Sequence, residues 1–372
     1  MKIAYLSGST LPSARANAIH VVRMCAALTR AGHSVTLVAR DGGSVPAEIF
    51  SYYGIADHSR FNLRLRSFAR WPILRGLSLS WSLASYVGNH RRPDLFYSRY
   101  PLLAALASLT GVGLVYEVHA MPKRRLDRLI EAVILSSENL RRVVAISQTL
   151  KDDYVAAWPK LEGIIVVAHD AADPSPTTTT RQLTWPGRPS APQVGYVGSL
   201  YPGKGVEIVV QLAKRLPDID FHIVGGKPED LARWQDDVDV TNLYLHGHVP
   251  HRDVQAYYSR FHVALAPVQR RVAVDFGSSD VGRWTSPLKV FEYMAAGLPT
   301  IASDVPTLRE ILKNGETAVL VPPDDLSAWV TALRNLVENG EDARRLGDSA
   351  RRDLEQHHTW DARAAKVLRD LP

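Results

Sequence analysis

Residues 284–299 combine side chains that suit the binding of an anion. Ser286 and Pro287 are typical of a helix start and Gly297 of a helix end, which predicts a short helix between them. Lys289 would lie in the first turn, where a cation opposes the helix dipole by about 0.3–1 kcal/mol unless an anion binds there. Because the backbone N–H groups of a helix start attract phosphate, this segment predicts a phosphate-binding site.

A carboxylate lies close to this predicted site. Glu292 follows Lys289 by three residues, so both side chains are on one face of the helix. The carboxylate could accept two hydrogen bonds from a vicinal diol such as that of ribose. The alternative is an ordinary amphipathic helix in which Lys289 and Glu292 form a salt bridge. The residue types alone leave both interpretations open.

A second lysine lies in residues 195–207, where an apolar strand leads through a glycine-rich loop into a helix. Lys204 stands between Gly203 and Gly205 at the helix start, where an ammonium group could hold a phosphate as a point charge. The alternative is a flexible loop with a solvated lysine.

The elements that must position these lysines alternate between strands and helices. Near-continuous apolar strands that alternate with helices predict parallel sheets covered on both faces. The expected strands are Lys2–Ser7, Ser34–Ala39, Leu95–Ser98, Leu114–Val118, Val143–Ile146, Ile164–Ala168, Val194–Val197, Phe221–Val224, Leu243–Leu245, Val263–Ala266, Thr300–Ser303 and Ala318–Val321. The expected helices are Ala18–Ala31, Leu102–Leu109, Arg124–Asn139, Thr149–Ala157, Val206–Leu216, Arg252–Ser259, Leu288–Ala296, Leu308–Lys313, Leu326–Glu338, Asp342–Gln356 and Trp360–Leu371.

This pattern predicts an α/β protein of two Rossmann-like, doubly wound domains. We expect the first domain at residues 1–168 and the second at 194–355, with a proline-containing linker at 169–193. A C-terminal helix within 356–372 could pack back on the first domain. Ligands should bind at the carboxyl ends of the strands, in a cleft between the domains.

Composition and charge narrow the function classes. The single cysteine, Cys25, excludes an internal disulfide and a cysteine cluster for zinc, so we expect a reduced, cytoplasmic protein without a secretory signal or a membrane span. The net charge is +6 but is +10 over residues 1–169 and −4 over the rest. The first half is therefore expected to meet an anionic partner.

Several nucleotide and metal motifs are absent from the sequence. The turn after the first strand, residues 8–12, lacks G-x-G-x-x-G, and no P-loop or H-E-x-x-H occurs. The triplets Asp218-Ile219-Asp220 and Asp237-Val238-Asp239 are interpreted as solvated carboxylates. We therefore expect no metal and no cofactor.

The two lysine segments, taken together, carry a family resemblance. A strand followed by G-x-L-x-x-x-K-G, and later P-x-K-x-x-E-x-M-A-x-G-x-P, resembles the donor-binding half of a family 4 glycosyltransferase with the GT-B fold. The resemblance covers roughly residues 1–340. Six supporting motifs occur in the expected order: Ala31-Gly32-His33-Ser34-Val35, Val115-Tyr116-Glu117-Val118-His119, Val144-Ala145-Ile146-Ser147, Val224-Gly225-Gly226, Leu245-His246-Gly247-His248-Val249 and Val319-Leu320-Val321-Pro322-Pro323.

The resemblance implies a retaining, metal-independent hexosyltransferase that moves a sugar from a nucleotide-sugar to an acceptor glycan, lipid-linked or small-molecule hydroxyl. The first domain would bind the acceptor and the second the donor. By position, Lys204 would neutralise the donor diphosphate and Glu292 would bind the ribose hydroxyls. His119 would lie beside the reacting sugar, although a histidine after an apolar strand could instead be structural.

The remaining donor-binding roles also follow from the resemblance. The phosphate oxygens would meet the helix start, the base would meet backbone groups of Gly247 to Val249, and the Gly8 loop would close on the diphosphate. The helix-start residues are Ser286, Pro287, Leu288 and Lys289.

Two positions depart from the family pattern. Ser199 stands where an arginine is usual, and Trp284 stands where a first glutamate is usual. For the lost cation, the candidates to compensate are Lys289, Arg270, Arg271 and Arg283. For the lost sugar ligand, they are Asp275, Asp280 and the backbone N–H groups of Leu288 and Lys289.

Two basic segments in the first domain bear on the acceptor. Residues 60–75 mix arginines with large apolar residues, and Lys123, Arg124, Arg125 and Arg128 cluster at a helix start. Peripheral docking on the anionic inner face of a membrane is one interpretation. Solvated helix edges with a phosphate-bearing acceptor are the other. We expect no nucleic-acid partner, because no recognition module accompanies the charge.

Two rival functions remain open at this stage. A nucleotide-sugar epimerase of the same architecture would use the same diphosphate site but would need acid and base carboxylates near the sugar. A non-catalytic nucleotide-binding or membrane-adaptor protein is the other rival, and the departures at Ser199 and Trp284 leave it open.

Overall fold

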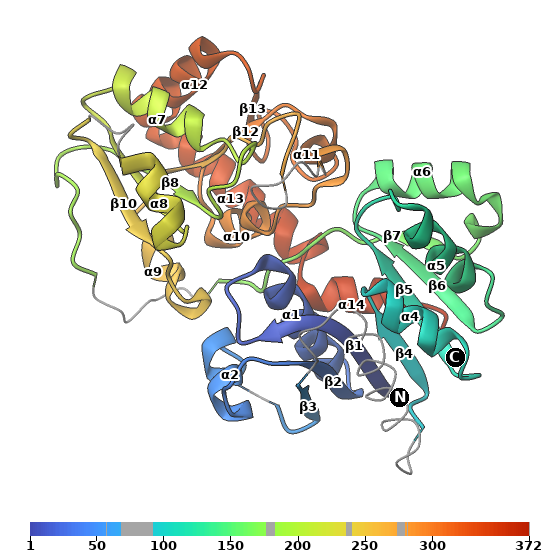
Figure 1. Cartoon of the computed structure of the whole chain (residues 1–372). Coiled ribbons are helices and arrows are strands. Elements are labelled where there is room, and N and C mark those ends of the chain that lie inside the picture. The colour runs from blue at the N-terminus through green and yellow to red at the C-terminus, as the bar shows by residue number, and fades with distance from the viewer. Residues whose placement is uncertain are drawn as a thin grey trace. The chain divides into compact units, whose positions relative to one another are not determined.

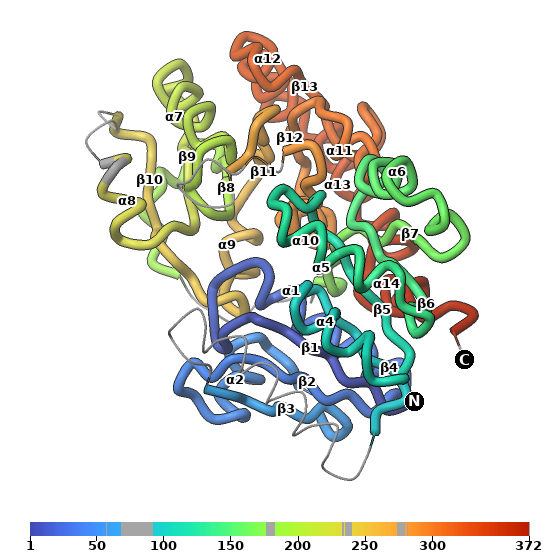
Figure 2. Tube along the Cα trace, turned by 45° about the vertical axis from the view of Figure 1, so that its right-hand side comes forward, coloured from blue at the N-terminus to red at the C-terminus, as the bar shows by residue number. Residues whose placement is uncertain are grey.

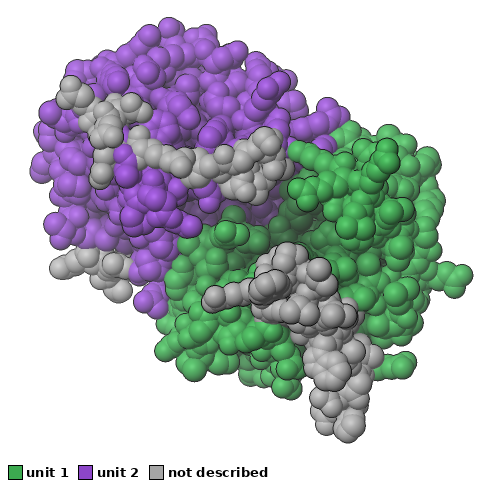
Figure 3. Space-filling view, viewed as in Figure 1, with its two compact units in different colours: residues 1–169, 360–372 green, residues 170–359 purple. Residues whose placement is uncertain are grey.

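The computed structural model describes residues 1–56, 58–67, 92–175, 183–235, 240–273, 280 and 282–371. The chain divides into two compact units, shown in green and purple in Figure 3. The first unit is Met1–His169 together with Trp360–Pro372, and the second is Asp170–Thr359.

The first unit is built on a seven-stranded parallel sheet with the order β3-β2-β1-β4-β5-β6-β7 (Figure 1). The strands are β1 (Lys2–Leu11), β2 (Ser34–Asp41), β3 (Phe61–Arg66), β4 (Leu95–Ser98), β5 (Gly113–Val118), β6 (Leu140–Ala145) and β7 (Ile165–Val167). The helices are α1 (Ala16–Arg30), α2 (Pro46–Tyr53), α4 (Pro101–Ser108), α5 (Arg125–Leu135), α6 (Gln148–Ala157), the short η1 (Pro159–Leu161) and α14 (Trp360–Leu368). The strand order reverses between β1 and β4, which makes their carboxyl ends the place where such sheets bind ligands.

The second unit holds a six-stranded parallel sheet with the order β10-β9-β8-β11-β12-β13. The strands are β8 (Gln193–Val197), β9 (Asp220–Val224), β10 (Leu243–Gly247), β11 (Val263–Ala266), β12 (Thr300–Ser303) and β13 (Val319–Val321). The helical elements are α7 (Val206–Arg215), α8 (Pro228–Gln235), η2 (His251–Asp253), α9 (Gln255–Tyr258), η3 (Gly282–Trp284), α10 (Leu288–Ala296), α11 (Pro306–Arg309), α12 (Leu326–Glu338) and α13 (Gly340–His357). Here the order reverses between β8 and β11.

Helices cover both faces of the second sheet. Neighbouring residues of β8 point to opposite faces, so Tyr196 belongs to one buried cluster with Trp329, while Val197 belongs to another with Phe291. Figure 2 shows α7 and α10 on different sides of these strands. The predicted doubly wound α/β architecture is confirmed. The prediction succeeded because strands buried on both faces must be apolar throughout, and such runs are visible in the sequence.

Several expected elements match the structure residue for residue, among them β4, β11, β12, α10 and α12. The expected end of the first strand at Ser7 is wrong. β1 continues through Gly8 to Leu11, with a shift in its pairing to β2 between Leu6 and Thr10. Gly8 therefore lies within an irregular strand, where an added Cβ would come within 2.8 Å of the Tyr100 ring.

The basic segment at 60–75 begins with a partly exposed strand and not with the helix edge that was one of its two interpretations. Its first part is the edge strand β3, which pairs with β2 from Phe61 to Arg66, and residues 68–75 lie outside the described residues. The helix α2 was not predicted from the sequence.

The unit boundaries differ from the expected domain boundaries at two places. Residues 183–193, expected in the linker, pack on the second unit, where Trp185 donates a 2.9 Å hydrogen bond from Nε1 to Gln193 and lies against the ring of His222. Residues 176–182 lie outside the described residues. The chain re-enters the first unit after Thr359 and not at residue 356. The helix α13 continues to His357 in the second unit, and the next helix, α14, packs against α1.

Every helix of the described ranges is too short or too polar to traverse a lipid bilayer.

Candidate active site

The loop after β8 positions Lys204 in the second unit. Gly203 and Gly205 on either side have φ values of 81° and 88°, and an added Cβ at each would lie 1.9 Å from a backbone carbonyl oxygen, that of Arg271 or Pro267. Only glycine fits such close approaches. Burial lowers the pKa of the Lys204 ammonium. Lys204 is half-buried, and its lowered pKa does not fit the alternative of a fully solvated lysine.

Lys289 comes from the first turn of α10 and is 8% exposed. Its Nζ makes no hydrogen bond within the part of the chain that the structure describes, and it lies 3.7 Å from the centre of the Tyr196 ring. Burial, together with the nearby charge of Lys204, holds the pKa of Lys289 well below its ordinary value. An added Cβ on Gly198, at the end of β8, would lie 3.5 Å from this Nζ.

Two ammonium groups therefore lie near each other, and no carboxylate of the described residues pairs with either. An unpaired buried cation costs several kcal/mol of solvation free energy unless an anion compensates it. The site lies at the carboxyl end of β8, where the strand order reverses, which is where doubly wound sheets bind ligands. This geometry suits a diphosphate.

Glu292 does not pair with Lys289, so the salt-bridge interpretation of α10 is wrong. Its Oε1 lies 2.7 Å from Nε2 of His251, and its Oε2 accepts a 2.7 Å hydrogen bond from the Tyr258 hydroxyl. The carboxylate is 18% exposed. Its two partners hold it in one orientation, with an exposed part that a diol could still reach.

The start of α10 differs by one residue from the expected cap. The helix begins at Leu288 after Pro287, and Ser286 lies outside it. The Ser286 hydroxyl accepts a 2.8 Å hydrogen bond from the backbone N–H of Asp170 and does not cap the helix. No side chain caps the first turn, which leaves the N–H groups of Leu288 and Lys289 for a ligand. Gly297 ends the helix with a φ of 65°, as predicted.

The other expected donor-binding residues of this unit follow strand ends. Ser199 comes two residues after β8, and its carbonyl oxygen accepts a 2.7 Å hydrogen bond from the Tyr196 hydroxyl. Gly247 ends β10 and accepts a 2.8 Å bond from the Gly225 N–H. Val249 is half-buried against the core.

Of the groups expected to replace the missing arginine, Lys289 is close enough to Lys204 for the charge of one to lower the pKa of the other. Arg270 instead lies 3.6 Å from Asp324, and both line a cavity of about 380 Å³ next to Gly203. Asp280 accepts backbone hydrogen bonds from Val272 and Gly282. Arg271 and Arg283 are exposed, Trp284 is half-buried in η3, and Asp275 lies outside the described residues.

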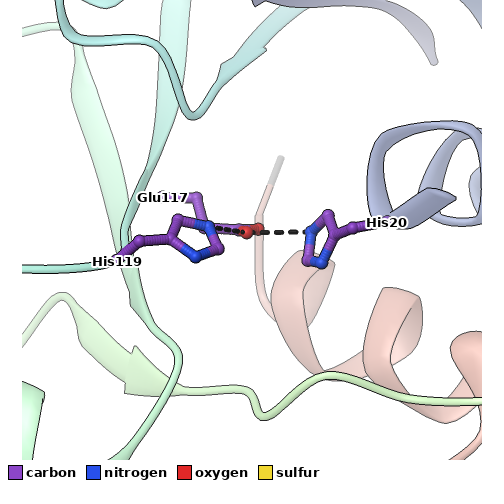
Figure 4. A group of neighbouring side chains, drawn as sticks. All are labelled: His20, Glu117 and His119. Atoms are coloured by element: carbon purple, nitrogen blue, oxygen red, sulfur yellow. Dashed lines mark hydrogen bonds and ion pairs between the residues drawn. The ribbon is translucent and has the colours of Figure 1, made fainter. Parts of the chain in front are cut away.

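His119, in the first unit, follows β5 and belongs to a buried polar network. Figure 4 shows His119 and His20 on either side of Glu117, and their Nε2 atoms lie 2.7 and 2.8 Å from the same carboxylate oxygen, Oε1. The other oxygen of Glu117 lies 3.0 Å from Arg363 of α14 and accepts a hydrogen bond from the Tyr97 hydroxyl.

The pKa values of this network follow from burial and charge. Burial acts to raise the pKa of the Glu117 carboxyl, but the charge of Arg363 and the contacts with His20 and His119 outweigh it, so this pKa is well below its ordinary value. Burial and the charge of Arg99 lower the pKa of His119 to about 4. At neutral pH the network therefore holds an ionised carboxylate and a neutral His119.

His20, Glu117 and His119 are also the one group of described residues whose ligand atoms are close enough to hold a metal ion. Two arginines already face this group, since Arg363 contacts Glu117 and Arg99 contacts His119. A further divalent cation would be repelled by both guanidinium groups. The arrangement fits an orienting hydrogen-bond network better than a metal site.

The D-x-D triplets require one correction. Asp220 is not solvated, because it is fully buried and accepts a 2.9 Å hydrogen bond from Nε of Arg188. Asp218 is partly exposed and pairs with Arg334. The second triplet, residues 237–239, lies outside the described residues.

Sequence reasoning missed four residues that define these sites. Glu117 and Tyr196 occurred within motifs but read as ordinary strand residues. Arg99 and His251 carried no spacing signal toward the residues they contact. A charged residue inside an apolar strand, such as Glu117, was the one available signal, because buried carboxylates need partners.

Comparison with known proteins finds glycosyltransferases over both units of the chain. The family described as "Glycosyltransferase Family 4" matches residues 18–175, and that described as "Glycosyl transferases group 1" matches residues 191–339. A glycogen synthase of Mycobacterium tuberculosis is 26% identical, over 92% of this chain and 87% of its own length. A D-inositol 3-phosphate glycosyltransferase of Paenarthrobacter aurescens is 25% identical, over 75% of this chain and 72% of its own length. Sucrose-phosphate synthase of Thermosynechococcus elongatus has a similar structure, with a TM-score of 0.76 and 20% identity over 98% of this chain and 97% of that one.

Proposed function

We propose that this chain, which belongs to glycosyltransferase family 4 and has the GT-B fold, moves a sugar from a nucleotide-sugar to an acceptor hydroxyl with retention at the anomeric carbon and without a metal ion. The observation that carries the proposal is the pair Lys204 and Lys289. Lys289 is buried and Lys204 is half-buried, neither pairs with a carboxylate of the described residues, and the pKa of each is lowered.

The reaction breaks the bond between the sugar and the diphosphate, so negative charge grows on the diphosphate and positive charge on the sugar ring. Lys204, Lys289 and the uncapped start of α10 are fixed in place before that charge develops. Groups arranged in this way stabilise a leaving group in the transition state at little reorganisation cost. This supports departure of the diphosphate without a metal ion.

Lys289 of α10 would supply the positive charge that the family's usual arginine provides at the position of Ser199. Lys289 Nζ lies beside Gly198, the residue before Ser199, so it brings a cation to the strand end at which the arginine is missing. Glu292, held by His251 and Tyr258, would accept hydrogen bonds from the ribose hydroxyls. Gly247 to Val249 would meet the base.

The acceptor is proposed to bind the first unit and to carry a phosphate group. The excess positive charge of residues 1–169 supports an anionic acceptor. The names of two similar proteins, an inositol-phosphate glycosyltransferase and a sucrose-phosphate synthase, contain a phosphorylated substrate or product.

A screen of nucleotide-sugars tests the proposed function. We expect one class among UDP-, GDP-, ADP- and TDP-sugars to raise the melting temperature, because a ligand at a hundred times its Kd adds about 2.7 kcal/mol of stability. Mass spectrometry should then detect sugar transfer only when an acceptor is present. Isomerisation of the sugar without an acceptor would favour an epimerase. Binding without transfer to any acceptor would favour a non-catalytic protein.

Peripheral contact with an anionic membrane is also part of the proposal, and α5 supports it. Leu126, Leu129 and Val133 share one face of α5 and are 66%, 65% and 48% exposed. The opposite face carries the buried Glu131, which accepts a 3.0 Å hydrogen bond from Tyr116. The exposed basic residues Arg124, Arg125 and Arg128 are close in sequence to this apolar face. Aliphatic side chains beside arginines fit an anionic lipid surface.

Binding to vesicles checks this surface. We expect the protein to sediment with phosphatidylglycerol vesicles and not with phosphatidylcholine vesicles, and the double variant Leu126→Gln/Leu129→Gln to lose about tenfold or more in affinity because less apolar area is buried. Val45→Gln is the matched control, since Val45 is 57% exposed elsewhere in the same unit. Equal binding of the double variant and the control would contradict the assignment.

A further inference from the structure

Arg99 is a half-buried arginine, and within the described ranges its guanidinium contacts no carboxylate. It follows β4 directly, and its Nη2 lies 3.1 Å from Nδ1 of His119. That contact is the one hydrogen bond its side chain makes among the described residues. A guanidinium has five N–H donors, so most of its hydrogen-bonding capacity is left for a ligand.

A chain of polar contacts orients this guanidinium. Glu117 is ionised, so its Oε1 accepts the Nε2–H of His119, and Nδ1 is then the unprotonated nitrogen that accepts from Arg99. Arg363 and Tyr97 hold the other oxygen of Glu117. The carboxylate thereby sets the tautomer of the imidazole, and the imidazole sets the direction of the guanidinium.

The position of Arg99 in the sheet also points to a ligand. β1 and β4 are neighbours although α1, β2 and β3 intervene in the sequence, so the strand order reverses between them. Parallel sheets bind ligands outside the carboxyl ends of their strands at this reversal. Arg99 follows β4 at that edge, and the next residue, Tyr100, packs against Gly8 of β1.

We propose that Arg99 binds a phosphate group of a substrate, and that His119 and Glu117 are positioning residues for it. An oriented guanidinium binds phosphate through two parallel hydrogen bonds. The inference rests on the proposed function for its ligand, because a transferase of this kind offers a donor diphosphate and, as proposed above, an acceptor phosphate. The shared chemistry is a phosphate oxygen pair facing Arg99.

Calorimetric titrations of the full chain test the site and identify the source of the phosphate. Arg99→Met is compared with wild type and with Arg141→Met, which removes an exposed arginine near the amino end of β6. One titration uses UDP, GDP, ADP and TDP, and a second uses inorganic phosphate with and without the nucleotide that binds. We expect Arg99→Met, and not Arg141→Met, to weaken one of these interactions about tenfold to a hundredfold.

The two arms of this experiment have separate meanings. Weaker nucleotide binding assigns Arg99 to the donor diphosphate, and weaker phosphate binding beside bound nucleotide assigns it to the acceptor. Unchanged affinities in both arms, or a wild-type protein that binds no phosphate in any form, overturn the proposal. Absence of sugar transfer by a wild type that binds phosphate through Arg99 would instead reject the proposed function alone.

The positioning role has its own measurement, the tautomer of His119 by nitrogen-15 NMR of the histidine-labelled chain. We expect the proton on Nε2 in wild type and a mixture of tautomers in Glu117→Gln, because an amide cannot accept from all the donors around Glu117. Glu131→Gln, which alters another buried carboxylate of this unit, should leave the tautomer unchanged. Glu117→Gln should also weaken phosphate binding only while Arg99 is present. An unchanged tautomer, or additive effects of the two substitutions, would exclude positioning.

Discussion

Replacing Lys204 by alanine should lower the rate of sugar transfer by about a hundredfold to a thousandfold, the loss typical when one fixed donor to a developing negative charge is removed. The reason is that Lys204 stands in a loop that Gly203 and Gly205 hold against the backbone of residues 267 and 271, so no other side chain can take its place without rebuilding the loop. Folding should change little, since the ammonium has no hydrogen-bond partner to lose among the described residues. Steady-state kinetics with the donor found in the screen, together with urea unfolding, measures both effects.

The matched control for this substitution is Lys214→Ala. Lys214 is exposed in the last turn of α7, the helix that begins just after Lys204. We expect wild-type turnover from the control. Wild-type turnover from Lys204→Ala would reject the assignment of the diphosphate site.

Replacing Lys289 by methionine should have opposite effects on stability and on donor binding. The free protein should become more stable, by roughly 1–4 kcal/mol, the range found when buried charged groups are replaced by apolar side chains of similar volume. Stabilisation by the nucleotide-sugar should largely disappear, because the second cation at the diphosphate is lost. Urea unfolding with and without donor measures the two effects in one experiment.

The pH dependence of stability gives an independent check on Lys289. Its pKa is lowered in the folded protein by burial and by Lys204, so between that lowered value and the ordinary value near 10.5 the unfolded chain binds more protons. Stability of the wild type should therefore rise with pH across this window. The gain in stability of Lys289→Met over the wild type should be largest below the lowered pKa and should decrease as the pH approaches 10.5.

The control for Lys289→Met is Lys313→Met, which removes a lysine that is 60% exposed and lies 3.4 Å from Glu316. It should alter neither donor binding nor the slope of stability with pH. A loss of stability in Lys289→Met, without a change in that slope, would show that the ammonium is not buried as a charge.

Local sequence signals predicted most of the elements that position the site. The helix α10 was predicted with its correct last residue because Gly297 has a strong backbone preference that acts within a turn, whereas Pro287, expected inside the helix, precedes it. β4, β11 and β12 were predicted because short apolar runs between breakers indicate buried strands. β1 was cut short at Gly8, since a glycine inside a strand resembles a turn until its pairing partner is known.

The pairing of charged side chains was predicted less well. The sequence left Lys289 with two possible partners, Glu292 or an anion, because residues three apart on a helix can pair. The structure resolves the choice, since both carboxylate oxygens of Glu292 form hydrogen bonds, one with His251 and one with Tyr258. These two residues contact α10 from η2 and α9, and their spacing in the sequence does not predict the contact.

The sequence by itself therefore determined the α/β class, the succession of strands and helices, and the types of residue that could bind a diphosphate. Only the tertiary structure decided which charges remain unpaired. It buries Lys289 beside Lys204 and joins Glu117 to Arg363, which are 246 residues apart in the chain. The physical reason is range: helix ends and strand runs depend on neighbouring residues, whereas burial and ion pairing depend on segments that meet only when the sheet and its helices assemble.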